Sequence, residues 1–189
     1  MFLWNAAGKP TPKSMNNPFV DVSEDAYYYQ AVLWAVGEGI TNGTDDHHFS
    51  PNLTANRAQC VTFLYRYVGA PAVENKTTFA DVPATAYYAD AVAWAAAEGV
   101  TNGTSSTTFS PDASVTRAQA VTFQWRAAGA PAAEGTNAFA DVSASAFYAP
   151  AVQWAVNAGV TTGTSDTTFS PNSNCLRAQI VSFLYRAAK

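Results

Sequence analysis

The sequence is poor in the residues on which many protein activities depend. Charged residues occupy only 13% of its 189 positions, the net charge is −4, and no basic patch marks a nucleic-acid or membrane surface. No apolar run approaches the roughly 20 residues of a membrane span. The two histidines and two cysteines form neither a zinc-ligand spacing nor a repeated serine–histidine or cysteine–histidine pair. We therefore expect no enzyme, no metal or other cofactor, no nucleic-acid partner and no membrane insertion.

What the sequence does contain is one pattern repeated three times, sixty residues apart, without insertion or deletion. Of the 48 columns that begin at residues 19, 79 and 139, 22 carry the same residue in all three copies. A fixed period of this size indicates one supersecondary unit whose copies bury apolar faces on one another. The units are 19–69, 79–129 and 139–189. Residues 1–18 resemble the end of such a unit and a linker, so we expect the chain to be a fragment of something longer.

Each unit is expected to form a helix, a loop and a second helix, which makes the fold mainly α. In the middle copy, apolar residues at 88, 91, 92 and 95 have helical spacing. They predict a first helix over 87–98, which Gly99 ends. The loop over 101–112 is rich in turn-forming residues and leaves room only for very short strands.

The second helix begins at a recognisable cap. Thr116 and Gln119 form a capping box, which predicts a helix from there to about residue 128. In the third copy Leu176 replaces the capping residue, so we expect a weaker or shifted helix start. The cysteines, Cys60 and Cys175, flank such helix starts, where the other copies carry apolar residues. Two buried thiols are the prediction, and a disulfide is the alternative.

The six arginines of the chain all lie in register between the copies. One set lies in the last turns of the second helix, where a cation interacts favourably with the helix dipole. It comprises Arg66, Arg126 and Arg186. The other set begins the same helix, where a cation faces the positive end of the dipole and needs compensation. This set comprises Arg57, Arg117 and Arg177.

Two explanations for the arginines at the helix start are open. One is a salt bridge to the only acidic position that all three copies share, and the other is an anionic ligand. Unpaired N–H groups at a helix start, together with a guanidinium, form an anion site. The shared acidic residues also have two possible roles. They form a turn or cap ahead of the first helix, or they contact the ligand. They are Asp21, Asp81 and Asp141.

Each copy also has a tryptophan in its first helix. It is either part of the core or a platform on which a sugar ring stacks, because tryptophans beside a groove often take that second role. The tryptophans are Trp34, Trp94 and Trp154.

Read in order, each copy contains Phe-x-Asp-Val, an aromatic pair before Ala-Val-x-Trp-Ala, Gly-(Ile/Val)-Thr-x-Gly, Phe-Ser-Pro and Arg-Ala-Gln. These motifs, in this order, resemble S-layer homology repeats over residues 19–189. The resemblance implies a pseudo-threefold assembly, in which one helix per unit forms a central three-helix bundle with three outer prongs. It also implies grooves between adjacent units that bind secondary cell-wall polysaccharide, commonly through a pyruvylated amino sugar.

In that family a threonine-arginine-alanine-glutamate motif supplies the arginine that binds the acidic sugar. It aligns here with Arg57, Arg117 and Arg177, which the resemblance makes ligand candidates. Arg117 is the first choice, because only Thr116 retains the threonine of the motif. The glutamate of the motif is glutamine in every copy, which removes a negative charge beside the arginine. These glutamines are Gln59, Gln119 and Gln179.

The function implied by the resemblance is a non-catalytic module that anchors a larger secreted protein, to which it is fused in cis. Its expected location is extracellular, in a Gram-positive-type cell wall or S-layer. The expected partner is an acidic, commonly pyruvylated, secondary cell-wall polysaccharide in the grooves between repeats. A protein-binding adhesin or self-assembling surface module is the alternative. The candidate ligand-binding residues are Arg57, Arg117, Arg177, Asp21, Asp81, Asp141, Trp34, Trp94 and Trp154.

Overall fold

The structure, a computed structural model, describes residues 10–74, 78–136 and 138–188. Within these ranges it contains six α-helices, two in each repeat, and no β-strand. The expectation of a mainly helical fold is therefore confirmed. Of the expected upstream segment 1–18, residues 1–9 lie outside the described part of the chain. The helices are α1 (Tyr29–Gly37), α2 (Arg57–Tyr67), α3 (Ala89–Ala97), α4 (Arg117–Ala127), α5 (Ala149–Asn157) and α6 (Arg177–Ala187).

The first helix of each unit is shorter than its apolar spacing predicts. In the middle copy α3 begins at Ala89 rather than at residue 87. Consecutive tight turns precede it, because the N–H of Ala86 donates to the carbonyl of Pro83 and that of Ala89 to the carbonyl of Ala86. At the other end Gly99 has a φ of +68°, and it turns the chain away as the sequence predicts.

The second helices begin where the capping boxes predict. In α4 the N–H of Gln119 donates to Thr116 Oγ1, and Gln119 Oε1 accepts from the N–H of Thr116. The expectation of a shifted start in the third copy is wrong, because α6 begins at Arg177, in register with the other two. There the N–H of Gln179 donates to the carbonyl of Leu176 instead of to a side chain. A weaker start at this position stays a prediction.

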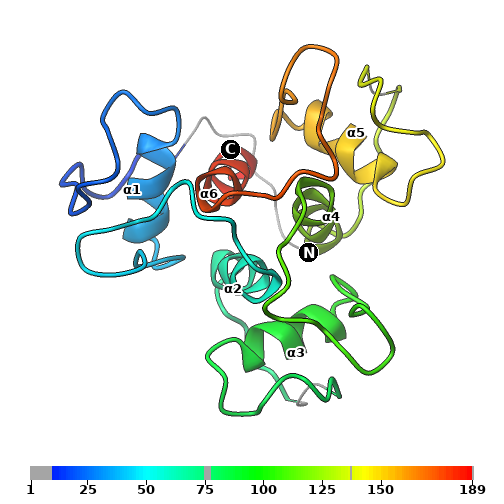
Figure 1. Cartoon of the computed structure of the whole chain (residues 1–189), viewed down its shortest axis with the longest axis horizontal. Coiled ribbons are helices and arrows are strands. Elements are labelled where there is room, and N and C mark those ends of the chain that lie inside the picture. The colour runs from blue at the N-terminus through cyan, green and yellow to red at the C-terminus, as the bar shows by residue number, and fades with distance from the viewer. Residues whose placement is uncertain (1–9, 75–77, 137, 189) are drawn as a thin grey trace.

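The second helices lie side by side at the centre of the molecule, and the first helices lie around them (Figure 1). Helices α2, α4 and α6 contact one another. Around this centre, α3 packs on α2, α5 on α4, and α1 on α6. Each outer helix therefore packs on the central helix of the preceding unit, and the outer helix of the first unit packs on the third. This arrangement closes the three units into a ring.

Backbone hydrogen bonds join the segments that precede the central helices. The N–H of Ala55 donates to the carbonyl of Cys175 (2.9 Å), that of Val115 to Ala55 (3.0 Å), and that of Cys175 to Val115 (2.8 Å). The three bonds form a closed cycle that contains one residue from each unit. Isolated β-bridges flank them, which agrees with the expectation of no more than very short strands.

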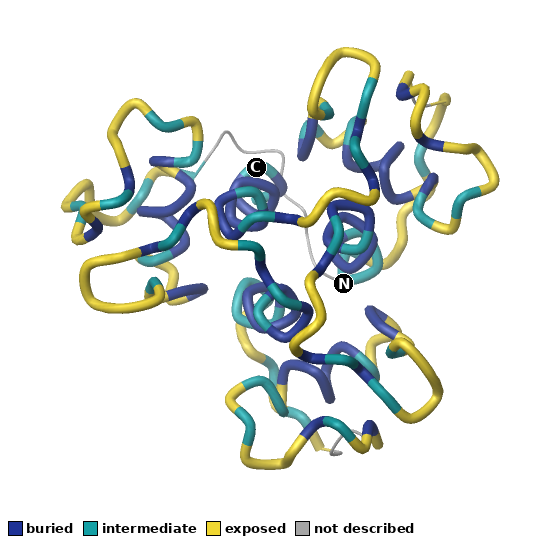
Figure 2. Tube along the Cα trace, viewed as in Figure 1, coloured by how far each residue is buried: buried dark blue, intermediate teal, exposed yellow. Residues whose placement is uncertain are grey.

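One hydrophobic cluster extends through all three units. Figure 2 shows the buried residues concentrated in the helices and the exposed residues in the outer loops. Cys60 and Cys175 are buried in this cluster as free thiols, which confirms the prediction from their flanking positions. Burial raises the pKa of both thiols, that of Cys175 to about 12. None of the described helices is long and apolar enough to span a lipid bilayer.

Candidate functional site

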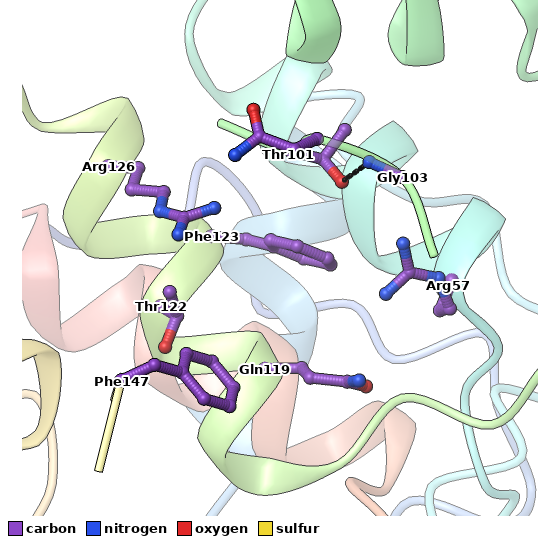
Figure 3. A pocket seen from close by; sticks show the side chains of 9 residues that line it. Arg57, Thr101, Gly103, Gln119, Thr122, Phe123, Arg126 and Phe147 are labelled. Atoms are coloured by element: carbon purple, nitrogen blue, oxygen red, sulfur yellow. Dashed lines mark hydrogen bonds between the residues drawn. The ribbon is translucent and has the colours of Figure 1, made fainter. Parts of the chain in front are cut away.

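A pocket of about 200 Å³ lies where the first, second and third units meet. The first unit contributes Arg57 from the start of α2, and the third contributes Phe147, which precedes α5. Figure 3 shows the guanidinium groups of Arg57 and Arg126 on opposite sides of the pocket, with Phe123 between them. The second unit supplies the rest of the lining, namely Thr101, Asn102, Gly103, Gln119, Thr122, Phe123 and Arg126. The described lining thus carries two cations and no carboxylate, which favours an anionic ligand.

The loop that forms one wall of this pocket requires glycine at Gly103. Its φ is +78°, a conformation that side chains rarely adopt. A Cβ atom here would overlap the carbonyl oxygen of Thr108 and would lie 2.6 Å from Cε1 of Phe79. The hydroxyl of Thr101 accepts the N–H of Gly103 (3.1 Å), as Figure 3 shows. The equivalent residues Gly43 and Gly163 also have positive φ, and this conformation allows the loop to pass close to the buried side chain of Phe79.

The arginine at the start of each central helix is held by the next unit along the ring. Arg57 is only 3% exposed, and its Nε donates to the carbonyl oxygen of Phe109 (2.8 Å). The guanidinium carbon lies 4.7 Å from the ring centroid of Phe109 and 5.3 Å from that of Phe123, within cation–π range. Arg117 and Arg177 make the equivalent contacts with the third and first units. Burial lowers the pKa of each of these guanidinium groups.

One nitrogen of each of these arginines is not used by the fold. The Nη2 atoms of Arg57, Arg117 and Arg177 are buried, and no described protein atom accepts a hydrogen bond from them. A buried donor without a partner costs ~1–3 kcal/mol, and more when it carries charge. All three copies have such an unpaired nitrogen. Arg57 also lines the pocket, and a ligand bound in this pocket could supply an acceptor. The arrangement fits a ligand that supplies an anionic oxygen.

The backbone at the helix start does not contribute to this site. We expected unpaired N–H groups there, and that expectation is wrong for the described residues. In α2 the N–H groups of Arg57 and Ala58 donate to the carbonyls of Ala113 and Pro111, at 2.9 and 3.0 Å. The N–H of Gln59 is bound by the capping side chain. The neighbouring unit therefore satisfies the helix end, and the guanidinium alone remains to bind an anion.

The shared aspartates hold a backbone turn. Asp81 Oδ1 accepts from the N–H of Phe109 (2.8 Å) and Oδ2 from the N–H of Ser110 (2.7 Å). Asp21 and Asp141 bind the equivalent N–H groups in their own units. Burial raises the pKa of Asp81, but the two N–H donors outweigh this effect and leave it below its ordinary value.

Among the described residues none of these aspartates forms an ion pair with arginine, so the salt-bridge explanation fails. The aspartates do have the capping role that we expected as the alternative to ligand contact. The turn that they cap, however, precedes the second helix and not the first.

The tryptophans belong to the core. Trp34, Trp94 and Trp154 are 4–8% exposed. The ring of Trp34 lies 5.5 Å from that of Tyr185 in α6, and the ring of Trp94 lies 5.7 Å from that of Tyr65 in α2. These contacts attach the outer helices to the central ones. Little of each tryptophan is accessible to a ligand, which favours the core role over sugar stacking.

Three other aromatic side chains occupy the position expected of a stacking platform. Tyr27, Tyr87 and Phe147 are 64–65% exposed, and each precedes a half-buried tyrosine. The pair of adjacent aromatic residues in each copy was the sequence signal for an exposed ring, because two neighbouring side chains in one turn cannot both face the core. Phe147 lines the pocket beside Arg57 and Arg126.

The same surroundings recur at the other unit boundaries. Although most of the Tyr27 side chain is exposed, partial desolvation raises its pKa, while the positive charges of Arg186 and Arg117 oppose the rise. Tyr27 therefore lies near those two arginines, as Phe147 lies near Arg57 and Arg126. Tyr87 is likewise near Arg177 and Arg66, as the effect of these charges on its pKa shows. Each boundary thus combines a helix-start arginine, a last-turn arginine and an exposed aromatic ring.

The arginines of the last turn were expected only to interact with the helix dipole. Instead they also face these boundaries, and Arg126 lines the pocket. Its Nη1 donates to the carbonyl of Val100 (3.3 Å), three residues after the outer helix of its own unit ends.

Comparison with known proteins identifies the same three tandem repeats. The family model of the S-layer homology domain matches residues 18–59, 78–121 and 138–181. A cell surface protein of Thermoanaerobacter kivui is 34% identical over 117 residues, which cover 59% of this chain and 15% of that protein. An endoglucanase of Bacillus sp. (strain KSM-635) is 35% identical over 113 residues, which cover 60% of this chain and 12% of the enzyme. The matched region is thus a small part of both relatives.

Proposed function

The chain belongs to the S-layer homology family, whose domains are non-catalytic cell-surface anchoring modules, and we propose that it binds an acidic cell-wall polysaccharide in the grooves between its units. The observation that carries this proposal is the pocket lined by Arg57 and Arg126, whose described lining contains no carboxylate. The Nη2 atom of Arg57 is buried and has no acceptor among the described protein atoms, and the Nη2 atoms of Arg117 and Arg177 are in the same state. A site of this kind favours a ligand with a carboxylate or similar anion.

The chemistry of the lining supports a carboxylate-bearing sugar. A guanidinium binds a carboxylate through charge-assisted hydrogen bonds, which are about twice as strong as neutral ones. The ring of Phe147 offers an apolar surface on which the face of a sugar can lie. Gln119 also lines the pocket, and its Oε1 accepts a hydrogen bond in the helix cap. Because its amide is neutral, it does not repel an anion beside Arg57. A pyruvylated amino sugar has both features that this lining accepts.

Three such grooves on one chain would strengthen attachment to a polymer. Linking several weak sites raises the effective concentration of the ligand at each, so overall avidity exceeds single-site affinity by factors of about 10²–10⁴. The relatives are several times longer than the matched region, which suits a module that attaches other domains to an envelope. We therefore propose an extracellular location in the cell wall or S-layer, with the effector fused in cis.

Co-sedimentation with isolated Gram-positive-type cell walls tests the proposal. The chain should sediment with intact walls, and it should stay in solution with walls from which the secondary polysaccharide has been removed. A variant with Arg57, Arg117 and Arg177 all replaced by methionine should stay in solution with both. Equal sedimentation with intact and extracted walls would refute polysaccharide binding.

The exposed aromatic residues favour one alternative. Tyr27, Tyr87 and Phe147 are apolar surfaces of the kind that protein interfaces also bury, so an adhesin or self-assembling surface module is the second candidate. That function predicts binding to a protein or to a second copy of the chain that survives loss of the three helix-start arginines. Analytical ultracentrifugation of the triple methionine variant, alone and with extracted walls, separates the two functions.

A further inference from the structure

The peptide group between Phe109 and Ser110 is held from both sides by charged side chains of two different units. On one side, Asp81 accepts the N–H of Ser110 at 2.7 Å and the adjacent N–H of Phe109 at 2.8 Å. On the other, the carbonyl of Phe109 accepts Nε of Arg57 at 2.8 Å. The carboxylate of the second unit and the guanidinium of the first are thus joined through a single amide.

This connection recurs around the ring with the same direction. Asp141 holds the turn whose carbonyl binds Arg117, and Asp21 holds the turn whose carbonyl binds Arg177. In each case the aspartate lies close enough for its charge to oppose the burial that lowers the pKa of the arginine. Each arginine is therefore paired with the aspartate of the next unit, without a direct ion pair among the described residues.

We infer that Asp21, Asp81 and Asp141 are positioning residues that orient the ligand-binding arginines through the backbone. Asp81 fixes the amide plane, and the amide polarised by a carboxylate becomes a stronger acceptor for Nε of Arg57. Because a guanidinium is planar and rigid, fixing the direction of Nε also fixes the direction of Nη2. The inference rests on the proposed function only for the identity of the ligand, because the hydrogen bonds that orient Arg57 are formed in the absence of a ligand.

The conformation of the turn explains why the aspartate is needed. Ser110 has a φ of +58°, a left-handed conformation that costs a non-glycine residue about 1–2 kcal/mol. Two hydrogen bonds to one carboxylate hold the turn in this conformation and set the direction of the Phe109 carbonyl. Both oxygens of Asp81 are engaged in this way, which favours a positioning role over direct ligand contact.

Hydrogen exchange of the arginine Nε–H groups tests the inference without any ligand. In the ¹⁵N-labelled chain, Asp81→Asn should accelerate exchange at Arg57 about tenfold, the factor that corresponds to ~1.4 kcal/mol. Arg117 and Arg177 should change less than twofold. The matched variants D21N and D141N should shift the effect to Arg177 and Arg117 respectively. Equal acceleration at all three arginines, or none at Arg57, would overturn the inference.

A second variant covers the case in which D81N does not fold. Asp81→Glu keeps the charge but moves the carboxylate by one methylene group, and it should show the same selective effect at Arg57. A merely structural role predicts loss of stability without this selectivity for one arginine. Thermal unfolding of each variant supplies that comparison.

Binding to wall polysaccharide fragments then links positioning to function. The loss of affinity caused by D81N should disappear when Arg57 is already methionine, whereas it should persist in the R117M background. If wild-type protein binds no fragments, the proposed function fails. The hydrogen-exchange rates at the arginines then still show whether the aspartates position them. If fragments bind but D81N and R57M act independently, positioning fails alone.

Discussion

Replacement of Arg57 by methionine should separate folding from binding. Arg57 is almost completely buried, and the fold uses its Nε in a hydrogen bond and its guanidinium against two phenylalanine rings. A hydrogen bond to a charged group is worth ~1.5–3 kcal/mol, and each cation–π contact adds ~0.5–2 kcal/mol. The variant therefore loses stabilising contacts worth several kcal/mol.

Removal of the charge offsets most of this loss. Burying a guanidinium costs several kcal/mol of desolvation, and its Nη2 has no acceptor within the described protein. Methionine fills a similar volume and has no polar group to satisfy. We expect the free energy of unfolding to change by less than about 2 kcal/mol, which for a chain of this length shifts Tm by less than about 8 °C. Affinity should respond far more, because removing one partner of a buried charge pair costs ~2–5 kcal/mol, about thirtyfold or more.

Isothermal titration calorimetry with short wall-polysaccharide fragments measures the affinity, and urea denaturation measures the stability. R57M should reduce the number of binding sites by one. R57K keeps the charge but lacks the planar fork and Nε, so it should lose most of the affinity as well. Lys13→Met is the matched control, because it removes one positive charge from an exposed ion pair with Glu38. An unchanged number of binding sites with unchanged affinity, together with a loss of more than about 4 kcal/mol in stability, would refute the argument and make Arg57 a structural residue.

Further predictions concern the fold. Gly103→Ala should lower Tm by roughly 5 °C or more in calorimetry, because its φ is +78° and a Cβ would overlap neighbouring backbone; an unchanged Tm would contradict the geometry of the loop. Leu176→Thr should stabilise the chain against urea by about 1 kcal/mol, since threonine can cap α6 and leucine cannot. The folded chain keeps the thiol protons of Cys60 and Cys175, whose pKa values are raised, whereas the unfolded chain releases them above about pH 8.5. Stability should therefore fall as pH rises from about 8.5, and less so in the Cys60→Ala, Cys175→Val variant.

The parts of the fold that depend on local signals could be predicted from the sequence. Helical spacing and a capping box are set by residues within a few positions of one another, so α4 begins as expected directly after its cap residue Thr116. The outer helices were placed less well, because their first residues form tight turns without a capping side chain. At Leu176 the sequence predicted a shifted helix start that the structure does not have. Hydrogen bonds to the neighbouring unit keep α6 in register although no side chain caps it.

The partners of the candidate site could not be predicted, because they lie far away in the sequence. The carbonyl that binds Arg57 is 52 residues away, and the one that binds Arg177 is 128 residues away. Nothing in the spacing of the repeats says which unit supplies that carbonyl. The sequence also could not predict that Tyr27, and not its neighbour Tyr28, is the exposed ring, because exposure depends on which unit packs against each side chain.

Closure of the ring makes the grooves a property of the three units together. The pocket beside Arg57 takes this helix-start arginine from the first unit, most of its wall, including Arg126, from the second and its exposed ring from the third. The bond from Arg177 to the carbonyl of Phe49 and the packing of α1 on α6 complete the equivalent boundary between the third and first units. A ligand bound as proposed would therefore contact residues whose relative positions exist only in the closed ring. Because such a ligand binds the folded chain and not the unfolded one, it must also stabilise the ring by mass action. Anchoring and folding are then two consequences of the same contacts between units.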